Sequence, residues 1–400
     1  MDLVWQVIFY AALLLSAAIG WLYFRDLGDV TQMVIKVKRE NALRFIRNEY
    51  RLLGIGLSAL AVVVALQLTI GILPAPAIWP IILIVFVFYA FPYVWVHYGL
   101  RNQLNTARFY PIEEARRYIN PATSVLVMEN NGVARAHPDH ELLRPHLAGK
   151  EEGLGGENVA MTYCAMANLG VAYTPEIEGE NLELEVLAQH GNNLILRDEA
   201  TGEPIQQIYG HRDRDGINGP GMRQWPAFRM SFRGFQRAYP NGEVFLNKPS
   251  KNPLLWLLDQ VTEQLFSFGI ARQHREEKPV MDNMSHFDDR LPNKTYVWGI
   301  NIGDDAVCFT DDFVFHNAGI VNTTIGGRGI VVAYDLEHES LGAWFNDSGE
   351  PVTSIDFFGN SNVGKLERVN TLKPGMFWHV WVEFFQHTDI NRIDPISEAA

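Results

Sequence analysis

The chain has 400 residues, of which 48% are apolar, and carries 46 acidic against 33 basic side chains, a formal net charge of −13. An acidic balance argues against nucleic acid as the main partner, because binding to phosphates needs a basic surface. The length suits two or three domains, and the two distant cysteines, Cys164 and Cys308, give no disulfide framework.

The first hundred residues predict a membrane anchor of three helices. Residues 3–24 form an apolar stretch without a charge, and residues 52–73 and 78–98 form two more, joined by a short proline-containing turn. About 20 such residues span the hydrocarbon core as a helix. Only Asp2 precedes the first stretch, whereas a cleaved signal peptide would begin with basic residues. We therefore interpret residues 1–100 as an integral anchor, with the lipid bilayer as a partner.

Basic residues near the ends of these stretches predict the orientation. Those between the first two stretches are Arg25, Lys36, Lys38, Arg39, Arg44, Arg47 and Arg51. Three crossings place this loop and the C-terminal part on one side, which the positive-inside rule assigns to the cytoplasm of a bacterial inner membrane. The basic amphipathic segment 33–50 is expected to lie along the inner headgroup surface.

Two segments of the remaining chain, residues 101–250 and 295–400, share the order and spacing of their motifs. Each contains an alternating stretch, then a Gly-Gly pair followed by an apolar run, then an aromatic stripe at helical spacing. Gly155-Gly156 of the first segment corresponds to Gly326-Gly327 of the second. The similarity predicts an internal duplication.

Each segment is mainly strand-like. In the first, an alternating run turns at Asn130-Asn131-Gly132, a strong signal for a tight hairpin. Residues 251–294 read as a linker helix, capped by Asn252 and continued by a charged loop. The sequence therefore predicts a mainly β (α+β) soluble domain built from two similar repeats, behind three transmembrane helices.

Three stretches carry a resemblance to a known family: GGENVAMTYC, NNLILRDEATGEPIQQIYG and RMSFRGFQRAYP. They resemble the bacterial family catalogued as domain of unknown function 3179, and the similarity extends over about residues 120–393. The resemblance implies no established activity. The Cys-x-x-Cys of that family is Cys164-Ala165-Met166-Ala167 here, which puts any role that needs two thiols in doubt.

Histidine and sulfur side chains concentrate in the first segment. His146 precedes the Gly-Gly turn and Cys164 lies on the strand after it, so the fold could bring an imidazole and a thiolate together. Such ligands favour copper or zinc, and a shared ion would require their ligand atoms to lie within about 4–5 Å. A Cys164 nucleophile with His146 as base is an alternative, and so are a turn-capping histidine and a buried apolar thiol.

The charged, glycine-rich stretch that begins His211-Arg212-Asp213 predicts an exposed loop that could bind a ligand at the rim of a pocket. The leading functional hypothesis is a membrane-anchored metal-binding or redox accessory protein. The alternative is a non-catalytic interaction module for a membrane protein complex. The sequence leaves open whether the chain is an enzyme.

Overall fold

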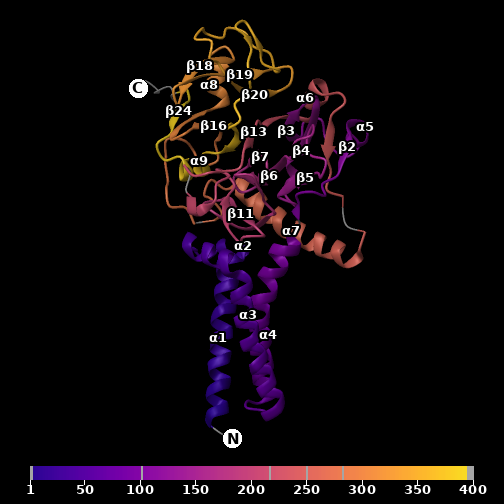
Figure 1. Cartoon of the computed structure of the whole chain (residues 1–400), viewed down its shortest axis with the longest axis vertical. Coiled ribbons are helices and arrows are strands. Elements are labelled where there is room, and N and C mark those ends of the chain that lie inside the picture. Colours follow the sequence, from indigo (N-terminus) through magenta and orange to yellow (C-terminus); the bar gives the residue numbers. More distant parts are fainter. Residues whose placement is uncertain (1–2, 101, 216–217, 249–250, 282, 394–400) are drawn as a thin grey trace.

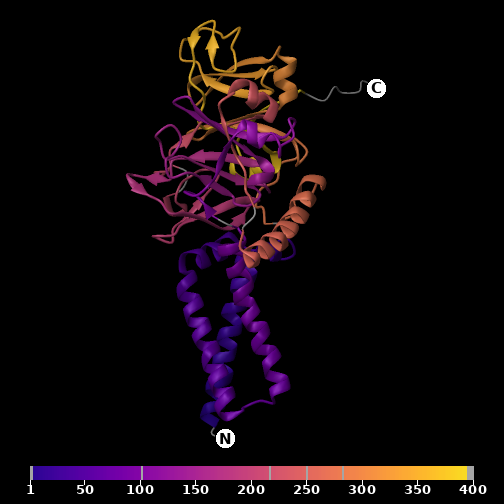
Figure 2. The ribbon, with the colours of Figure 1, turned by 90° about the vertical axis from the view of Figure 1, so that its right-hand side faces the viewer.

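The computed structural model describes residues 3–100, 102–215, 218–248, 251–281 and 283–393. It has a bundle of long helices at one end and a strand-rich region at the other, and the N-terminus lies at the far end of the bundle (Figure 1). The rotated view shows the same division (Figure 2). The fold is therefore three apolar helices followed by a sheet-rich α+β region.

Three helices of the bundle are long and apolar enough to cross a membrane, as predicted. They are α1 (Leu3–Leu27), α3 (Arg39–Ile70) and α4 (Ala75–Val94), the last extended by the π-helical turn η1 (Trp95–Gly99); the short helix α2 (Asp29–Gln32) joins the first two. Tyr89 of α4 packs where α1 and α3 carry glycines, and a Cβ at Gly56 would lie 2.1 Å from the Tyr89 hydroxyl. Small residues at such positions let membrane helices approach closely.

Helix α3 begins 13 residues earlier than the predicted apolar stretch, at Arg39 rather than at residue 52. The basic residues from Arg39 onward therefore belong to the same helix as the apolar stretch. Asn48 is the one residue of this helix with non-helical backbone angles. Arg39 and Arg47 both pair with Asp213 of the soluble region. These two arginines thus bind a carboxylate of the folded domain, and the expectation that segment 33–50 lies along the headgroups stays a prediction.

The first half of the soluble region contains three main sheets. Their orders are β14-β3-β4-β15-β2, β1-β5-β6-β7-β13 and β10-β11-β12. The strands are β1 (Asn102–Gln103), β2 (Phe109–Pro111), β3 (Ser124–Asn130), β4 (Val133–Pro138), β5 (Leu147–Gly149), β6 (Ala160–Cys164), β7 (Leu169–Tyr173), β10 (Leu184–His190), β11 (Asn193–Asp198), β12 (Pro204–Gln206), β13 (Gln224–Trp225), β14 (Phe228–Ser231) and β15 (Glu243–Phe245). A small hairpin of β8 (Glu176–Ile177) and β9 (Glu180–Asn181) and the helices α5 (Ile112–Ala115) and α6 (Phe232–Ala238) complete this half.

The second half contains a four-stranded sheet, β23-β16-β17-β24, and a three-stranded sheet, β18-β19-β20. The strands are β16 (Tyr296–Ile302), β17 (Asp305–Phe309), β18 (Ile320–Ile325), β19 (Arg328–Asp335), β20 (Ser340–Phe345), β23 (Lys373–Phe377) and β24 (Asp389–Asn391), with a small hairpin of β21 (Asn360–Ser361) and β22 (Gly364–Lys365). The helices are α8 (Asp311–His316) and α9 (Trp378–Phe384). The long helix α7 (Pro253–Arg275) joins the two halves in sequence.

The halves share part of their strand pairing. The order β14-β3-β4-β15 has two antiparallel pairs and then a parallel pair, and so does β23-β16-β17-β24. In each half, three further strands pair antiparallel in chain order. The sheet β10-β11-β12 belongs to the first half and packs against the anchor, since Leu187 and Ile195 share a core with Ile46 and Trp95. The duplication itself stays a prediction.

The predicted aromatic stripes form cores. Phe232 and Phe235 of α6 are buried in one cluster, and Trp378 and Trp381 of α9 are buried in another. The position of the Trp381 ring depends on a glycine, because a Cβ at Gly299 of β16 would lie 2.2 Å from this ring. The stripes therefore stabilise the fold.

Candidate functional site

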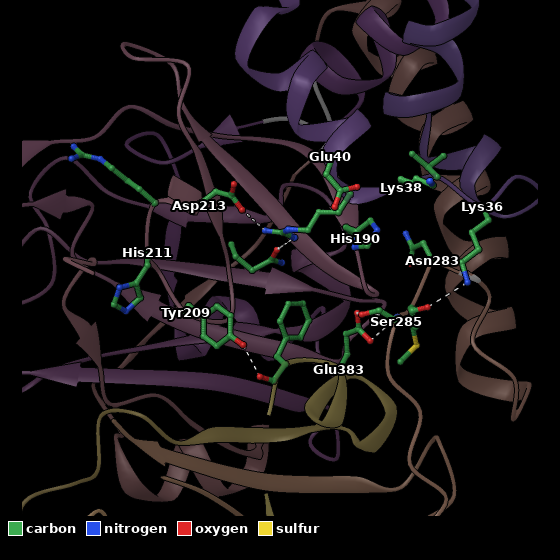
Figure 3. A pocket seen from close by; sticks show the side chains of 16 residues that line it. Lys36, Lys38, Glu40, His190, Tyr209, His211, Asp213, Asn283, Ser285 and Glu383 are labelled. Atoms are coloured by element: carbon green, nitrogen blue, oxygen red, sulfur yellow. Dashed lines mark hydrogen bonds and ion pairs between the residues drawn. The ribbon is translucent and has the colours of Figure 1, made fainter. Parts of the chain in front are cut away.

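A cavity of about 720 Å³ lies where the anchor meets the soluble region; we call it the juxtamembrane cavity. Lys36 and Lys38 border it from the segment before α3, whereas Tyr209, His211 and Asp213 border it from the soluble domain (Figure 3). All three residues of the predicted binding loop, His211, Arg212 and Asp213, line it.

Most charges in the juxtamembrane cavity are bound by neighbouring protein groups. Arg39 donates to Gln206 Oε1 at 2.6 Å and to Asp213 Oδ1 at 2.7 Å (Figure 3). Arg212 pairs with Glu180 at 2.9 Å. Glu383 accepts hydrogen bonds from the Ser285 amide and hydroxyl. The predicted loop thus borders a cavity, but its arginine and its aspartate form ion pairs within the protein.

A second cavity, also of about 720 Å³, adjoins the first and shares Tyr209, His211 and Phe384 with it; we call it the inter-half cavity. Its wall combines residues of both halves, including Gln224 from the first and Lys373 from the second. The two halves meet nearby through backbone contacts, for example Phe377 N donating to Ala167 O at 3.0 Å.

Lys373 is a buried lysine in the wall of the inter-half cavity. Only 1% of its surface is exposed. Its Nζ donates to Asn301 Oδ1 at 2.6 Å, to the Thr371 carbonyl at 3.0 Å and more weakly to Gln224 Oε1 at 3.4 Å. Among the described residues no carboxylate forms an ion pair with it. Burial without a counter-charge lowers the pKa of Lys373 to about 7.

Further donors surround Lys373. Gln224 Nε2 and Thr371 Oγ1 are both buried, and neither has a hydrogen-bond partner among the described residues. His211 and Arg223 also line the wall, and Arg223 pairs with Glu157 at 2.9 Å; Asp304 is the single carboxylate in this wall that the structure describes. A cavity rich in donors, with an uncompensated buried ammonium group, is suited to an anion.

The sequence reasoning missed Lys373. The available signal was its position: the lysine in TLKPGMFWHVW lies five residues before Trp378, the first residue of an aromatic stripe that was itself expected to be buried. What could not be inferred was the pairing of β23 with β16, which places Asn301 beside Lys373.

His146 and Cys164 line one small cavity of about 40 Å³, between the first half, α7 and the end of α4. Burial lowers the pKa of His146 to about 4, so the imidazole is neutral, and its Nδ1 has no hydrogen-bond partner among the described residues. Cys164 Sγ lies 3.5 Å from the Asn192 carbonyl oxygen. The rest of the lining is mostly apolar, with Gln189 as its amide side chain.

In the part of the chain that the structure describes, no three His, Cys, Asp or Glu side chains come together as a metal site. The hypothesis of copper or zinc at His146 and Cys164 therefore lacks a third ligand of these types. The two residues line one cavity, their predicted separation of about 4–5 Å stays a prediction, and the mainly apolar lining favours packing.

The family model described as "Protein of unknown function (DUF3179)" matches residues 103–388. This range contains every residue that lines the inter-half cavity. Neither the curated proteins nor the solved structures include a match to this chain.

Proposed function

The chain belongs to the family described as protein of unknown function DUF3179, and we propose that it is a membrane-anchored protein that binds a small organic anion in its inter-half cavity. The observation that carries the proposal is Lys373, which is 1% exposed and has no carboxylate partner among the described residues. This assignment replaces a metal site as the leading functional hypothesis.

The electrostatics of Lys373 favour a bound anion. Transferring an ammonium group from water into protein costs several kcal/mol unless an opposite charge or good hydrogen bonds offset it. The three acceptors around Nζ are neutral, and the weakest of them, Gln224 Oε1 at 3.4 Å, leaves one N–H donor of the protonated amine for an anion. A carboxylate or phosphate in the cavity would supply the missing charge and could accept from Gln224 Nε2 and Thr371 Oγ1.

The size of the cavity indicates the class of ligand. A volume of about 720 Å³ lies within the range of about 300–1,000 Å³ that is typical of small-molecule sites. The wall contains Met222 and Phe385 besides the polar groups. We therefore assign an organic carboxylate or phosphate ester, whose apolar part contacts these two side chains.

The experiment is ligand identification from the full chain, purified in mild detergent. Native mass spectrometry and analysis of the released small molecules should find an anion bound at about one per chain. Lys373→Met should lower its occupancy at least tenfold, as expected when a charge-assisted hydrogen bond worth about 1.5–3 kcal/mol is lost.

Lys294→Met is the matched control. Lys294 is another partly buried lysine, whose pKa is lowered to about 8 by burial, but it does not line the inter-half cavity. An anion retained equally by both variants, or a folded wild-type protein without any anion, would refute the proposal.

Two features beyond the ligand complete the proposal. The shared strand pairing supports the origin of residues 101–250 and 295–400 as two repeats. The basic residues near the helix ends support a bacterial inner-membrane location with the soluble region in the cytoplasm. The cavity then takes its anion from the cytoplasm.

A further inference from the structure

One end of helix α7 lies beside the junction between the helix bundle and the soluble region, and the helix rises obliquely from there along the soluble region (Figures 1 and 2). It begins with a side-chain cap, in which Asn252 Oδ1 accepts from Leu254 N at 3.0 Å. Its middle packs on the end of the third spanning helix, where the Phe266 and Trp95 rings stack at 4.8 Å. The helix is therefore fixed beside the point where the chain leaves the membrane.

The buried face of α7 carries polar groups. Asp259 is 5% exposed and pairs with Arg144 at 2.5 Å. Gln273 is fully buried and donates to the Met166 carbonyl at 2.6 Å. These contacts fix which side of the helix faces the protein.

An adjoining face carries an exposed apolar stripe. Its members are Leu254, Leu257, Val261, Leu265 and Phe268, which are 45–78% exposed. Offsets of 0, 3, 7, 11 and 14 residues place them on one side of a helix. This pattern inverts the usual one, in which a surface helix turns its apolar stripe toward the core.

We propose that α7 lies in the membrane interface, with this stripe inserted at the boundary between lipid headgroups and acyl chains. Lipid is assigned as the partner of the stripe because α7 packs against the end of the third spanning helix. The turn against which α7 packs continues the third spanning helix, and its Tyr98 and the preceding Val94 are 52% and 39% exposed on the surface available to lipid. Val261 and Leu265 of the stripe are the chain neighbours of Thr262 and Phe266, which contact this turn at Gly99 and Trp95. The soluble region would then be held to the membrane by α7 as well as by the spanning helices.

The test uses the full chain in vesicles of phosphatidylethanolamine and phosphatidylglycerol. Nitroxide labels are attached to Leu257→Cys and, separately, to Val261→Cys; Cys164 and Cys308 are fully buried and so are protected from labelling. Glu263→Cys is the matched control, because Glu263 is exposed on α7 but lies half a turn away from the centre of the stripe.

We expect the two stripe labels to be relaxed strongly by oxygen and weakly by a water-soluble nickel complex, and the Glu263→Cys label to show the reverse. Water-like accessibility at both stripe positions overturns the proposal. Shielding from both reagents together with spin–spin broadening also overturns it, and assigns the stripe to a second copy of the chain. These readouts do not depend on anion binding.

Discussion

Arg197 Nη1 donates to Glu49 Oε2 at 2.7 Å and so joins strand β11 of the soluble region to helix α3 of the anchor. Both side chains are almost completely buried. Glu185 also accepts from Arg197, and Tyr23 of α1 donates to Glu49 at 2.5 Å. The pair therefore lies at the centre of a polar cluster that holds two parts of the chain together.

Breaking this pair should destabilise the protein strongly. Arg197→Met leaves the buried Glu49 carboxylate without its guanidinium partner, and such a loss costs about 3–5 kcal/mol. We expect a clearly lower melting temperature in detergent, with earlier proteolysis between anchor and domain. Arg116→Met, which removes an exposed pair with Glu113, should change stability by less than about 1 kcal/mol. Equal effects of the two substitutions would contradict the role of the buried pair.

Lys373 should make the ligand-free protein more stable as the pH rises. Its folded pKa of about 7 lies below the ordinary 10.5, so between these values the unfolded state binds more protons, and stability increases with pH. Lys373→Met should therefore melt higher than wild type at pH 6, and this advantage should shrink towards pH 10. Melting curves of both proteins across this range provide the measurement, with the exposed Lys365→Met as control.

Anion binding should tighten as the pH falls through 7, because the ligand selects the protonated amine of Lys373. Titrating the identified anion by calorimetry at pH 6 and pH 8 should show proton uptake at pH 8 and an affinity several-fold higher at pH 6. The Lys294→Met variant should keep this dependence. An affinity that is independent of pH in wild type would exclude Lys373 as the counter-charge.

Buried histidines should make the soluble region sensitive to acid. Burial lowers the pKa of His137 and His379 to about 3 and of His146 and His190 to about 4. Below pH 6.5 the unfolded chain takes up protons that the folded chain excludes, so each histidine can cost up to about 1.4 kcal/mol per pH unit. Stability measured from pH 7 to pH 4 should fall, and His146→Gln should flatten that fall more than the exposed His316→Gln.

A reporter fused to the C-terminus should behave as cytoplasmic. Three spanning helices put the N-terminus and the soluble region on opposite sides, and basic residues near the helix ends favour the cytoplasm for the latter. Alkaline phosphatase fused there should be inactive in intact cells, and a fluorescent protein should be fluorescent. Active phosphatase would reverse the assigned orientation.

Local signals in the sequence predicted the elements that depend on neighbouring residues. The turn at Asn130-Asn131-Gly132 joins β3 to β4, with φ of 50° at Asn131 and 77° at Gly132. Asn252 caps α7 as expected. The three helices that are long and apolar enough to cross a membrane follow from apolar length alone. In each case the determining interaction lies within one segment, so periodicity and turn chemistry are sufficient.

The candidate site depends on contacts between distant segments, which periodicity does not describe. Lys373 is buried because β23 pairs with β16, and Gln224 reaches it across 149 positions of the chain. Likewise, the pairing of Arg39 with Asp213 spans 174 positions, so it could not be inferred from the basic segment alone. The sequence placed His146 and Cys164 on either side of one turn and so suggested that they lie close together. In the structure both residues line one small cavity.

The apolar core shared by the anchor and the sheet β10-β11-β12 has a consequence for biogenesis. Leu187 and Ile195 are covered by Ile46 and Trp95, which are in place only once the helices have assembled. A chain whose helices fail to insert would present an uncovered apolar sheet face to chaperones and proteases. The soluble region would thus complete its fold only in chains whose helices have inserted into the membrane. Proteases could remove the chains whose helices have not inserted.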